Sequence, residues 1–429
     1  MSKQISAGLA LLTLISLCTG SFLPRSQAQT AATANAQNAA IVSTTAAMLK
    51  ETSELRELSI LKAVKSGAQS RADIERMIIR NLDSDTTPAE MHAAEVLLRA
   101  FGLAPKDFAY RTFLVKLLTE QVAGYYDPKA QQFYLADWIE LDGQKPVMAH
   151  ELTHALQDQH FNLKRFEKWP QGDSDAELAA HALIEGDATL AMTIYMSKNP
   201  LVALAFLKSL GGQEVASEQF RRAPRALRES LLFPYEEGSA WATQLYKRGG
   251  WETVSQAFTK LPQSSEQILH ADKYFAAEAP QKLALLELRT MLGATWKRID
   301  YDINGEWGYY LILDEFLNNQ PESKQATAGW GGDRFALYET GKPDEYFIAQ
   351  ITAWDTPNDA REFFDAYAKR TLKRYPDAKE TKANDDRMEW QTGNGGVAME
   401  LRGSRVAIVE GVPSSADSQN LLRTIWQQR

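Results

Sequence analysis

The architecture of this chain depends on the residues Pro146-Val-Met-Ala-His150-Glu151-Leu-Thr-His154-Ala-Leu-Gln-Asp158. Proline suits the first turn of a helix, and the apolar residues that follow it recur at helical spacing. Because His154 follows His150 by four positions, a helix places both imidazoles on one face, about one turn apart. The sequence therefore predicts a helix whose apolar side packs inward and whose two histidines can reach one ion.

Two acidic residues complete this pattern. Glu151 flanks the histidine pair and cannot comfortably be a third ligand, but it can take a proton from water activated by a metal. The best candidate for the third ligand is Glu185, in Leu183-Ile-Glu185-Gly186-Asp-Ala188, because an acid among apolar residues needs a partner. Gly186 costs its helix about 1 kcal/mol relative to alanine. Close approach of the His150–His154 helix would explain that glycine; the alternative is an exposed Glu185 beside a tolerated glycine.

The segments around this motif predict an α+β protein. Residues 41–123 have a helical pattern, with apolar positions at 60–64, 74–79, 93–101 and 113–122. Residues 122–135 then predict two aromatic strands around an Asp-Pro turn. Ser174-Asp-Ala-Glu177 has the pattern of a capping box at the head of a second long helix, and helical segments continue to about residue 292.

A separate α+β module is predicted for residues 293–429. Alternating apolar patterns indicate strands near 334–338 and 346–351, followed by an amphipathic helix near 358–375. Residues 397–401 and 406–409 predict a hairpin, and residues 418–426 predict a final helix.

The first residues have the pattern of an export signal. Lys3 precedes an apolar stretch from Ile5 to Leu23, and Ser26-Gln-Ala28 supplies small residues for cleavage. We therefore expect residues 1–28 to be a signal peptide and the protein to be secreted or periplasmic, without an integral membrane domain after cleavage. The alternatives are an uncleaved anchor and a lipoprotein attached through Cys18, although Leu17 is bulky for a lipoprotein signal.

The composition narrows the chemistry. Cys18 is the one cysteine, so the chain after residue 28 has neither disulfides nor a thiolate nucleophile, and His, Asp and Glu must hold any metal. Asp and Glu number 55 against 47 Lys and Arg, which gives a formal net charge of −8. An acidic chain without a sustained basic stretch is a poor candidate for binding nucleic acid.

These motifs resemble those of the gluzincin (peptidase MA-like) zinc metallopeptidases, in particular their aminopeptidase branch. The resemblance covers residues 124–250 and rests on His-Glu-x-x-His, on the downstream Glu-Gly-x-Ala, and on Pro234-Tyr235-Glu-Glu-Gly238. It implies a zincin-like catalytic region over residues 124–292, mainly helical with a small sheet, after a flexible start and helical N-terminal region at 29–123. It also implies one Zn²⁺ held by His150, His154 and Glu185, with Glu151 as general base and Tyr235 stabilising the oxyanion.

The chain departs from that family in two ways. The gap between His154 and Glu185 is longer than usual, and the Gly-Ala-Met-Glu-Asn segment that binds a free amino terminus is missing. Gly396-Val-Ala-Met-Glu400 resembles it only superficially. We therefore expect an endopeptidase acting on peptides or proteins. The alternative function is a zinc-stabilised, inactive binding or assembly protein of the cell envelope.

Other polar residues near the motifs are weaker candidates. His181 lies one turn before Glu185, and Asp158, Asp187 and Thr189 are spaced to orient an imidazole. The remaining candidates are His160, close to the motif, and His270, in a Ser265–His270 segment that is similar to uncharacterised secreted bacterial proteins.

Overall fold

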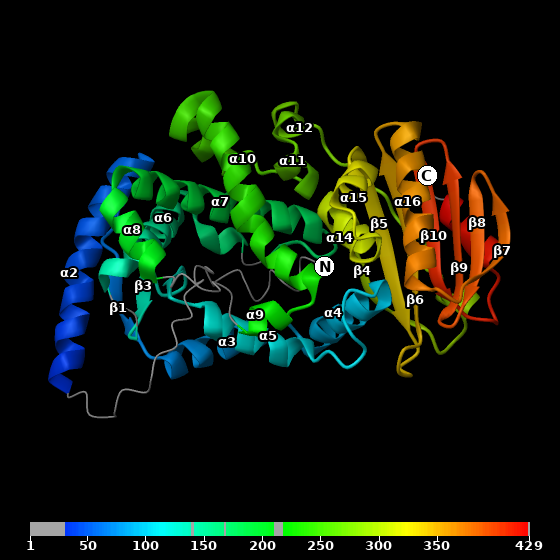
Figure 1. Cartoon of the computed structure of the whole chain (residues 1–429), viewed down its shortest axis with the longest axis horizontal. Helices are drawn as coiled ribbons and strands as arrows, with labels where there is room; N and C mark the ends of the chain where they lie inside the picture. The colour runs from blue at the N-terminus through cyan, green and yellow to red at the C-terminus, as the bar shows by residue number, and fades with distance from the viewer. Residues whose placement is uncertain (1–30, 139–140, 167–168, 210–217, 428–429) are drawn as a thin grey trace.

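The computed structural model describes residues 31–138, 141–166, 169–209 and 218–427, so the predicted signal peptide lies outside the described residues. The protein has an α+β fold, as the sequence predicts. A helical part with a three-stranded sheet is followed by a part built around a seven-stranded sheet. The two sheets lie at opposite ends of the molecule, with the long helices α7 and α10 between them (Figure 1).

The small sheet has the order β1-β3-β2. Strand β3 (Gln132–Ala136) pairs in parallel with β1 (Lys65–Gln69) and antiparallel with β2 (Gly124–Asp127), so β2 forms an edge. The aromatic strands β2 and β3 confirm the predicted pair. The helices of this part are α2 (Ala31–Arg56), α3 (Arg71–Asp85), α4 (Pro88–Phe101), α5 (Tyr110–Gln121), α6 (Lys145–Phe161), α7 (Ser174–Lys198), α8 (Pro200–Ser209), α9 (Glu218–Arg222), α10 (Arg225–Ala257), α11 (Ser265–Leu269), α12 (Ala271–Phe275) and α13 (Arg289–Leu292).

One expectation for the N-terminal part is wrong. Residues 60–64 are not helical, because the chain there runs from the end of α2 into β1. Strand β1 of the segment 29–123 completes the small sheet, and α2 packs against α6.

The two motif helices begin close to the predicted residues. Pro146 lies in the first turn of α6, as expected. The predicted capping box at Ser174 is wrong, however, because the N-cap of α7 is Asp173, whose side chain accepts from the backbone N–H of Ala176. Ser174 donates instead, through its backbone N–H and its hydroxyl, to the carboxylate of Asp302. The head of α7 is therefore attached to the C-terminal module.

All neighbours in the seven-stranded sheet are antiparallel, in the order β4-β5-β6-β10-β9-β8-β7. Alternate residues face opposite sides: Leu337 and Ile348 join the core that includes α16, whereas Ala336 and Phe347 join the core that includes α17. The elements are β4 (Lys297–Asp302), α14 (Gly305–Leu317), α15 (Gln320–Thr327), β5 (Trp330–Glu339), β6 (Tyr346–Trp354), α16 (Pro357–Arg374), β7 (Lys379–Asn384), β8 (Arg387–Thr392), β9 (Gly395–Arg402), β10 (Arg405–Val412) and α17 (Ser418–Trp426).

The predicted strands, hairpin and helices of this module are confirmed by β5, β6, α16, β9, β10 and α17, while β4, β7 and β8 were not predicted. In the described part of the chain, no single helix combines the length and apolar character of a membrane span. Helices α7 and α8 meet those criteria only together, as a pair bent by 112°.

Candidate metal centre

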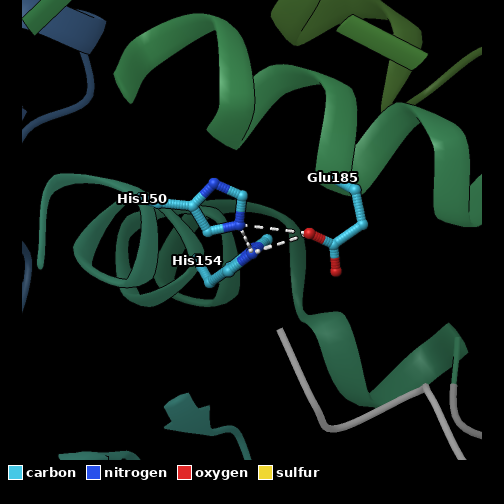
Figure 2. A group of neighbouring side chains, drawn as sticks. All are labelled: His150, His154 and Glu185. Atoms are coloured by element: carbon cyan, nitrogen blue, oxygen red, sulfur yellow. Dashed lines mark hydrogen bonds and ion pairs between the residues drawn. The ribbon is translucent and has the colours of Figure 1, made fainter. Parts of the chain in front are cut away.

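Helices α6 and α7 bring together three side chains that could hold a metal ion (Figure 2). His150 and His154 project from α6, and Glu185 reaches them from α7. The Nε2 atoms of His150 and His154 lie 3.0 Å apart. Oε2 of Glu185 lies 3.1 Å from Nε2 of His150 and 3.4 Å from Nε2 of His154. All three predicted ligands therefore converge on one point.

The three donor atoms suit a single metal ion. Two ligands that are each about 2.0–2.1 Å from a tetrahedral ion lie about 3.4 Å apart, close to the separations found here. Two imidazole nitrogens and a carboxylate oxygen are also ligands that zinc accepts. A helix that is buried from Pro146 to Asp158 gives these groups a fixed position.

The electrostatics of the three groups favour a protonated His154 paired with an ionised Glu185. Burial lowers the pKa of His150 to about 4. Burial would also lower the pKa of His154, but the charge of Glu185 outweighs it and raises that pKa to about 9. For Glu185, burial acts upward, yet His154 and the hydrogen bonds to both imidazoles lower the pKa to about 2. The carboxylate is thus ionised and ready to bind a cation.

Glu151 is held by strand β2. The backbone N–H of Tyr126 donates to Oε2 of Glu151 over 2.9 Å, and Glu151 is fully buried. The Tyr126 hydroxyl donates to Oδ2 of Asp158 over 2.9 Å. Asp158 therefore fixes β2 against α6 and does not orient an imidazole. Tyr126 was missed in the sequence, where it was only one of several strand aromatics.

Tyr235 lies beside the three ligands. Its ring stacks on that of His150, with 6.2 Å between the centroids and 26° between the planes. The aromatic residue of the Pro234–Gly238 segment and the His-Glu-x-x-His helix are therefore neighbours in space, although α10 lies far along the chain from α6.

Gly186 has a different explanation from the one predicted. A Cβ atom on Gly186 would lie 2.2 Å from the carbonyl oxygen of Gly238, and one on Gly238 would lie 2.3 Å from that of Ala182. The helix that approaches Gly186 is therefore α10 and not α6. Because Glu185 and Tyr235 are each within three residues of these glycines, a single helix crossing brings both side chains to His150.

His154 has a further buried contact through Gln157. Nδ1 of His154 lies 2.8 Å from Oε1 of Gln157, whose amide nitrogen donates to Oδ2 of Asp187 over 2.8 Å and to the carbonyl of Ile184 over 3.0 Å. Asp187, a candidate for orienting an imidazole, therefore reaches His154 through an intermediate. Gln157 had no signal in the sequence beyond its position one turn after His154.

The remaining candidate residues have no contact with the donor atoms of His150, His154 and Glu185 among the contacts described. His181 is one turn from Glu185 on α7, and burial lowers its pKa to about 4. Within the described part of the chain, the buried Thr189 hydroxyl has no hydrogen-bond partner. His160 contacts the carbonyl of Ser59, and His270 pairs with Glu306 at 2.9 Å. The segment 396–400 lies in β9, in the large sheet.

A second group of acids already has its cation. Glu266, Glu278 and Asp355 are close enough together to hold a metal ion. The ammonium of Lys273 lies 2.6, 2.9 and 2.5 Å from their respective carboxylates. This lysine supplies the positive charge that the three acids require, so the candidate metal centre is the one on α6 and α7.

Comparison with known proteins gives information on the C-terminal module alone. Residues 290–422 match the model of a family described as a domain of unknown function (DUF8575). No curated protein and no solved structure matches the chain. The family match begins after α12, so it includes none of His150, His154 and Glu185; it delimits the module that carries the seven-stranded sheet.

Proposed function

We propose that this protein is a zinc-dependent peptidase, with endopeptidase action favoured, and that His150, His154 and Glu185 hold the ion. The observation that carries the proposal is the convergence of their three donor atoms, with the buried carboxylate of Glu151 on the same helix turn. A purely structural metal site has no use for an acid in that position.

The chain's own residues have distinct parts in the proposed reaction. Zinc in such a site supplies Lewis-acid chemistry, which polarises a carbonyl and makes water acidic near neutral pH. Glu151, held by the N–H of Tyr126, accepts the proton of the attacking water and passes it to the leaving amine. The resemblance to the gluzincin segment and the position over His150 assign a role to Tyr235. Its hydroxyl donates a hydrogen bond to the carbonyl oxygen of the substrate as negative charge develops there.

In the proposed reaction, strand β2 holds an extended substrate. It is the edge of the small sheet, and its residue Tyr126 directs its backbone N–H toward Glu151. Main-chain pairing with an edge strand is a general means of holding an extended peptide. A substrate added to β2 would lie beside the proposed base.

The deciding experiment is digestion of a mixed peptide library by the zinc-loaded protein, with cut sites identified by mass spectrometry. The matched variant is Glu151→Gln, which keeps the shape of the side chain but cannot accept the proton. We expect internal cuts with the wild type, loss of nearly all of them in the variant, and equal zinc content in both proteins. A chelator should stop the wild-type reaction, and added zinc should restore it.

Two outcomes would contradict the proposal. Cleavage that persists unchanged in Glu151→Gln would show that another group is the base or that a contaminant is responsible. A wild-type protein that binds zinc and cuts no peptide would favour the metal-stabilised binding or assembly protein of the envelope.

A further inference from the structure

Arg56 ends helix α2 inside the protein, next to the candidate metal centre. Its side chain is fully buried. Nε donates to Oδ1 of Asp187 over 2.5 Å and Nη2 donates to Oδ2 over 3.1 Å, so the guanidinium binds both carboxylate oxygens. Bidentate pairs of this kind fix orientation as well as charge.

The end of α10 completes the surroundings of Arg56. The guanidinium lies over the Trp251 ring, 4.4 Å from its centroid, and donates to the Ser255 hydroxyl over 3.1 and 3.2 Å. Both residues follow Gly249 and Gly250, where α10 leaves helical geometry. Arg56 therefore connects α2 with α7 and with the last part of α10, and three elements fix its position.

The contacts continue from Arg56 to the imidazole of His154. Oδ2 of Asp187 accepts from both Arg56 and the amide nitrogen of Gln157. With that nitrogen also facing the carbonyl of Ile184, the amide oxygen of Gln157 must face Nδ1 of His154. Nδ1 then carries a proton, which leaves Nε2 as the nitrogen that would bind a metal ion. The tautomer needed for metal binding is set by this series of contacts.

The guanidinium of Arg56 is necessary for that arrangement. Asp187 and Gln157 are fully buried, and Arg56 holds both carboxylate oxygens of Asp187 in place. Without the guanidinium, the carboxylate loses its fixed position, so the Gln157 amide loses a positioned acceptor and is free to rotate. The effect of losing Arg56 therefore reaches His154 through two intermediates, without any contact between Arg56 and the ion.

We infer that Arg56 is a positioning residue for the metal ligand His154, acting through Asp187 and Gln157, and that α2 is a permanent part of the working site and not a removable pro-segment. This inference rests on the proposed metal site.

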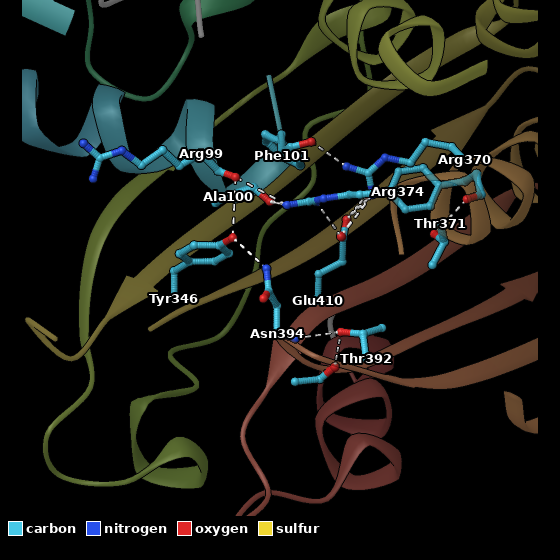
Figure 3. A network of polar contacts seen from close by, with 12 residues as sticks. Arg99, Ala100, Phe101, Tyr346, Arg370, Thr371, Arg374, Thr392, Asn394 and Glu410 are labelled. Atoms are coloured by element: carbon cyan, nitrogen blue, oxygen red, sulfur yellow. Dashed lines mark hydrogen bonds and ion pairs between the residues drawn. The ribbon is translucent and has the colours of Figure 1, made fainter. Parts of the chain in front are cut away.

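The test compares Arg56→Met with Arg370→Met. Arg370 is the matched control because it is also fully buried and pairs with a buried carboxylate, Glu410, but belongs to the C-terminal module (Figure 3). The zinc dissociation constant of each full-length protein is measured by competition with a chromophoric chelator, after its fold is checked by circular dichroism. We expect Arg56→Met to weaken zinc binding about 10- to 100-fold and Arg370→Met to change it less than about threefold. Arg56→Lys should recover part of the loss.

Equal zinc affinity in wild type and folded Arg56→Met would overturn the inference, and so would an equal loss in Arg370→Met. If Arg56→Met does not fold, Gln157→Met decides by the same comparison, since it leaves the ion pair intact and removes only the link to His154. A wild-type chain that binds no zinc would overturn the proposed function and this inference together. If the wild type binds zinc and the variants bind it equally well, this inference alone is overturned.

Discussion

At the scale of single residues, the three ligands hold one proton that a metal ion must displace. Near neutral pH, His150 is neutral and Glu185 is ionised, while the pKa of His154 is raised to about 9. A histidine must lose its second proton before it can bind a metal.

We therefore predict that zinc binding at pH 7.5 releases close to one proton, and that the apparent affinity rises with pH until about pH 9. In the metal-free protein, the raised pKa of His154 stabilises the fold fully below its ordinary value of 6.5, and this contribution is lost as the pH rises through about 9. Calorimetry in buffers of different ionisation enthalpy measures the released protons. Binding without proton release would contradict the charge state described here.

Tyr235→Phe tests the stacked aromatic residue. The substitution keeps the ring over His150 and removes only the hydroxyl, so zinc affinity should stay within a few-fold of wild type. If the hydroxyl stabilises developing charge, kcat should fall by about 10²- to 10³-fold, the usual effect of losing one such donor. Steady-state assays on a peptide identified from the library give both kcat and KM. A change in KM alone would assign Tyr235 to substrate binding.

The convergence of His150, His154 and Glu185 could be predicted from the sequence because their pattern has a direct physical meaning. His150 and His154 are one helical turn apart, and Glu185 stands out as an acid among apolar residues. Gln157 and Arg56 have no such signal. A glutamine or a terminal arginine is ordinary on a helix, and only tertiary packing gives these two their role.

At the scale of elements, the crossing of α7 and α10 needs glycine on both helices. We predict that Gly186→Ala lowers the free energy of unfolding by about 3 kcal/mol, the upper end of the usual cost of overpacking, because the new methyl group meets main-chain atoms that cannot rotate away. Gly238→Ala should behave similarly. Gly393→Ala is the control, since its Cβ meets its nearest neighbour at an ordinary 3.5 Å, and it should change stability by less than about 0.5 kcal/mol.

Urea unfolding measures these differences, and zinc affinity adds a second test of the same crossing. Helices that separate at Gly186 carry Glu185 away from α6, so a folded Gly186→Ala protein should also bind zinc more weakly. Wild-type stability and affinity in that variant would show that the crossing adapts.

Helices and strands were predictable where a buried face required apolar residues at the regular spacing of that element. Strands β5, β6, β9 and β10 alternate between two cores, and their pattern is strong. Strand β1 is Lys-Ser-Gly-Ala-Gln and β7 is Lys-Glu-Thr-Lys-Ala-Asn, with few apolar residues to mark them. Each lies at the edge of its sheet, where backbone hydrogen bonds to one neighbouring strand hold it without a row of buried apolar side chains. The capping box failed because Asp302, distant in sequence, binds Ser174 instead.

At the scale of the whole molecule, the C-terminal module is attached to the helical part through buried charges. Arg370 donates to the carbonyl of Phe101 over 2.8 Å, and Arg374 donates to that of Ala100 over 2.5 Å (Figure 3). Both arginines also bind Glu410, whose pKa is lowered because their charges outweigh the effect of burial. Two cations of α16 thus cap the last carbonyls of α4.

We predict that Glu410→Gln lowers the free energy of unfolding by about 3–5 kcal/mol, because it leaves two buried arginines without their carboxylate. Glu322→Gln is the control, since its pair with Lys369 is partly exposed and should contribute less than about 1 kcal/mol. Urea denaturation followed by circular dichroism gives both values. A similar, small loss in the two variants would show that the module is attached mainly by its apolar core.

The capping of α4 by α16 also affects how the chain is made. Helix α4 leaves the ribosome before the arginines that satisfy its last carbonyls, which follow it by 269 and 274 residues. An incomplete chain that stops before Arg370 carries His150, His154 and Glu185, yet it leaves the carbonyls of Ala100 and Phe101 without the donors from α16. We expect proteases to cut such a product more readily at that helix end, so the docking contact distinguishes chains that include α16 from chains that lack it.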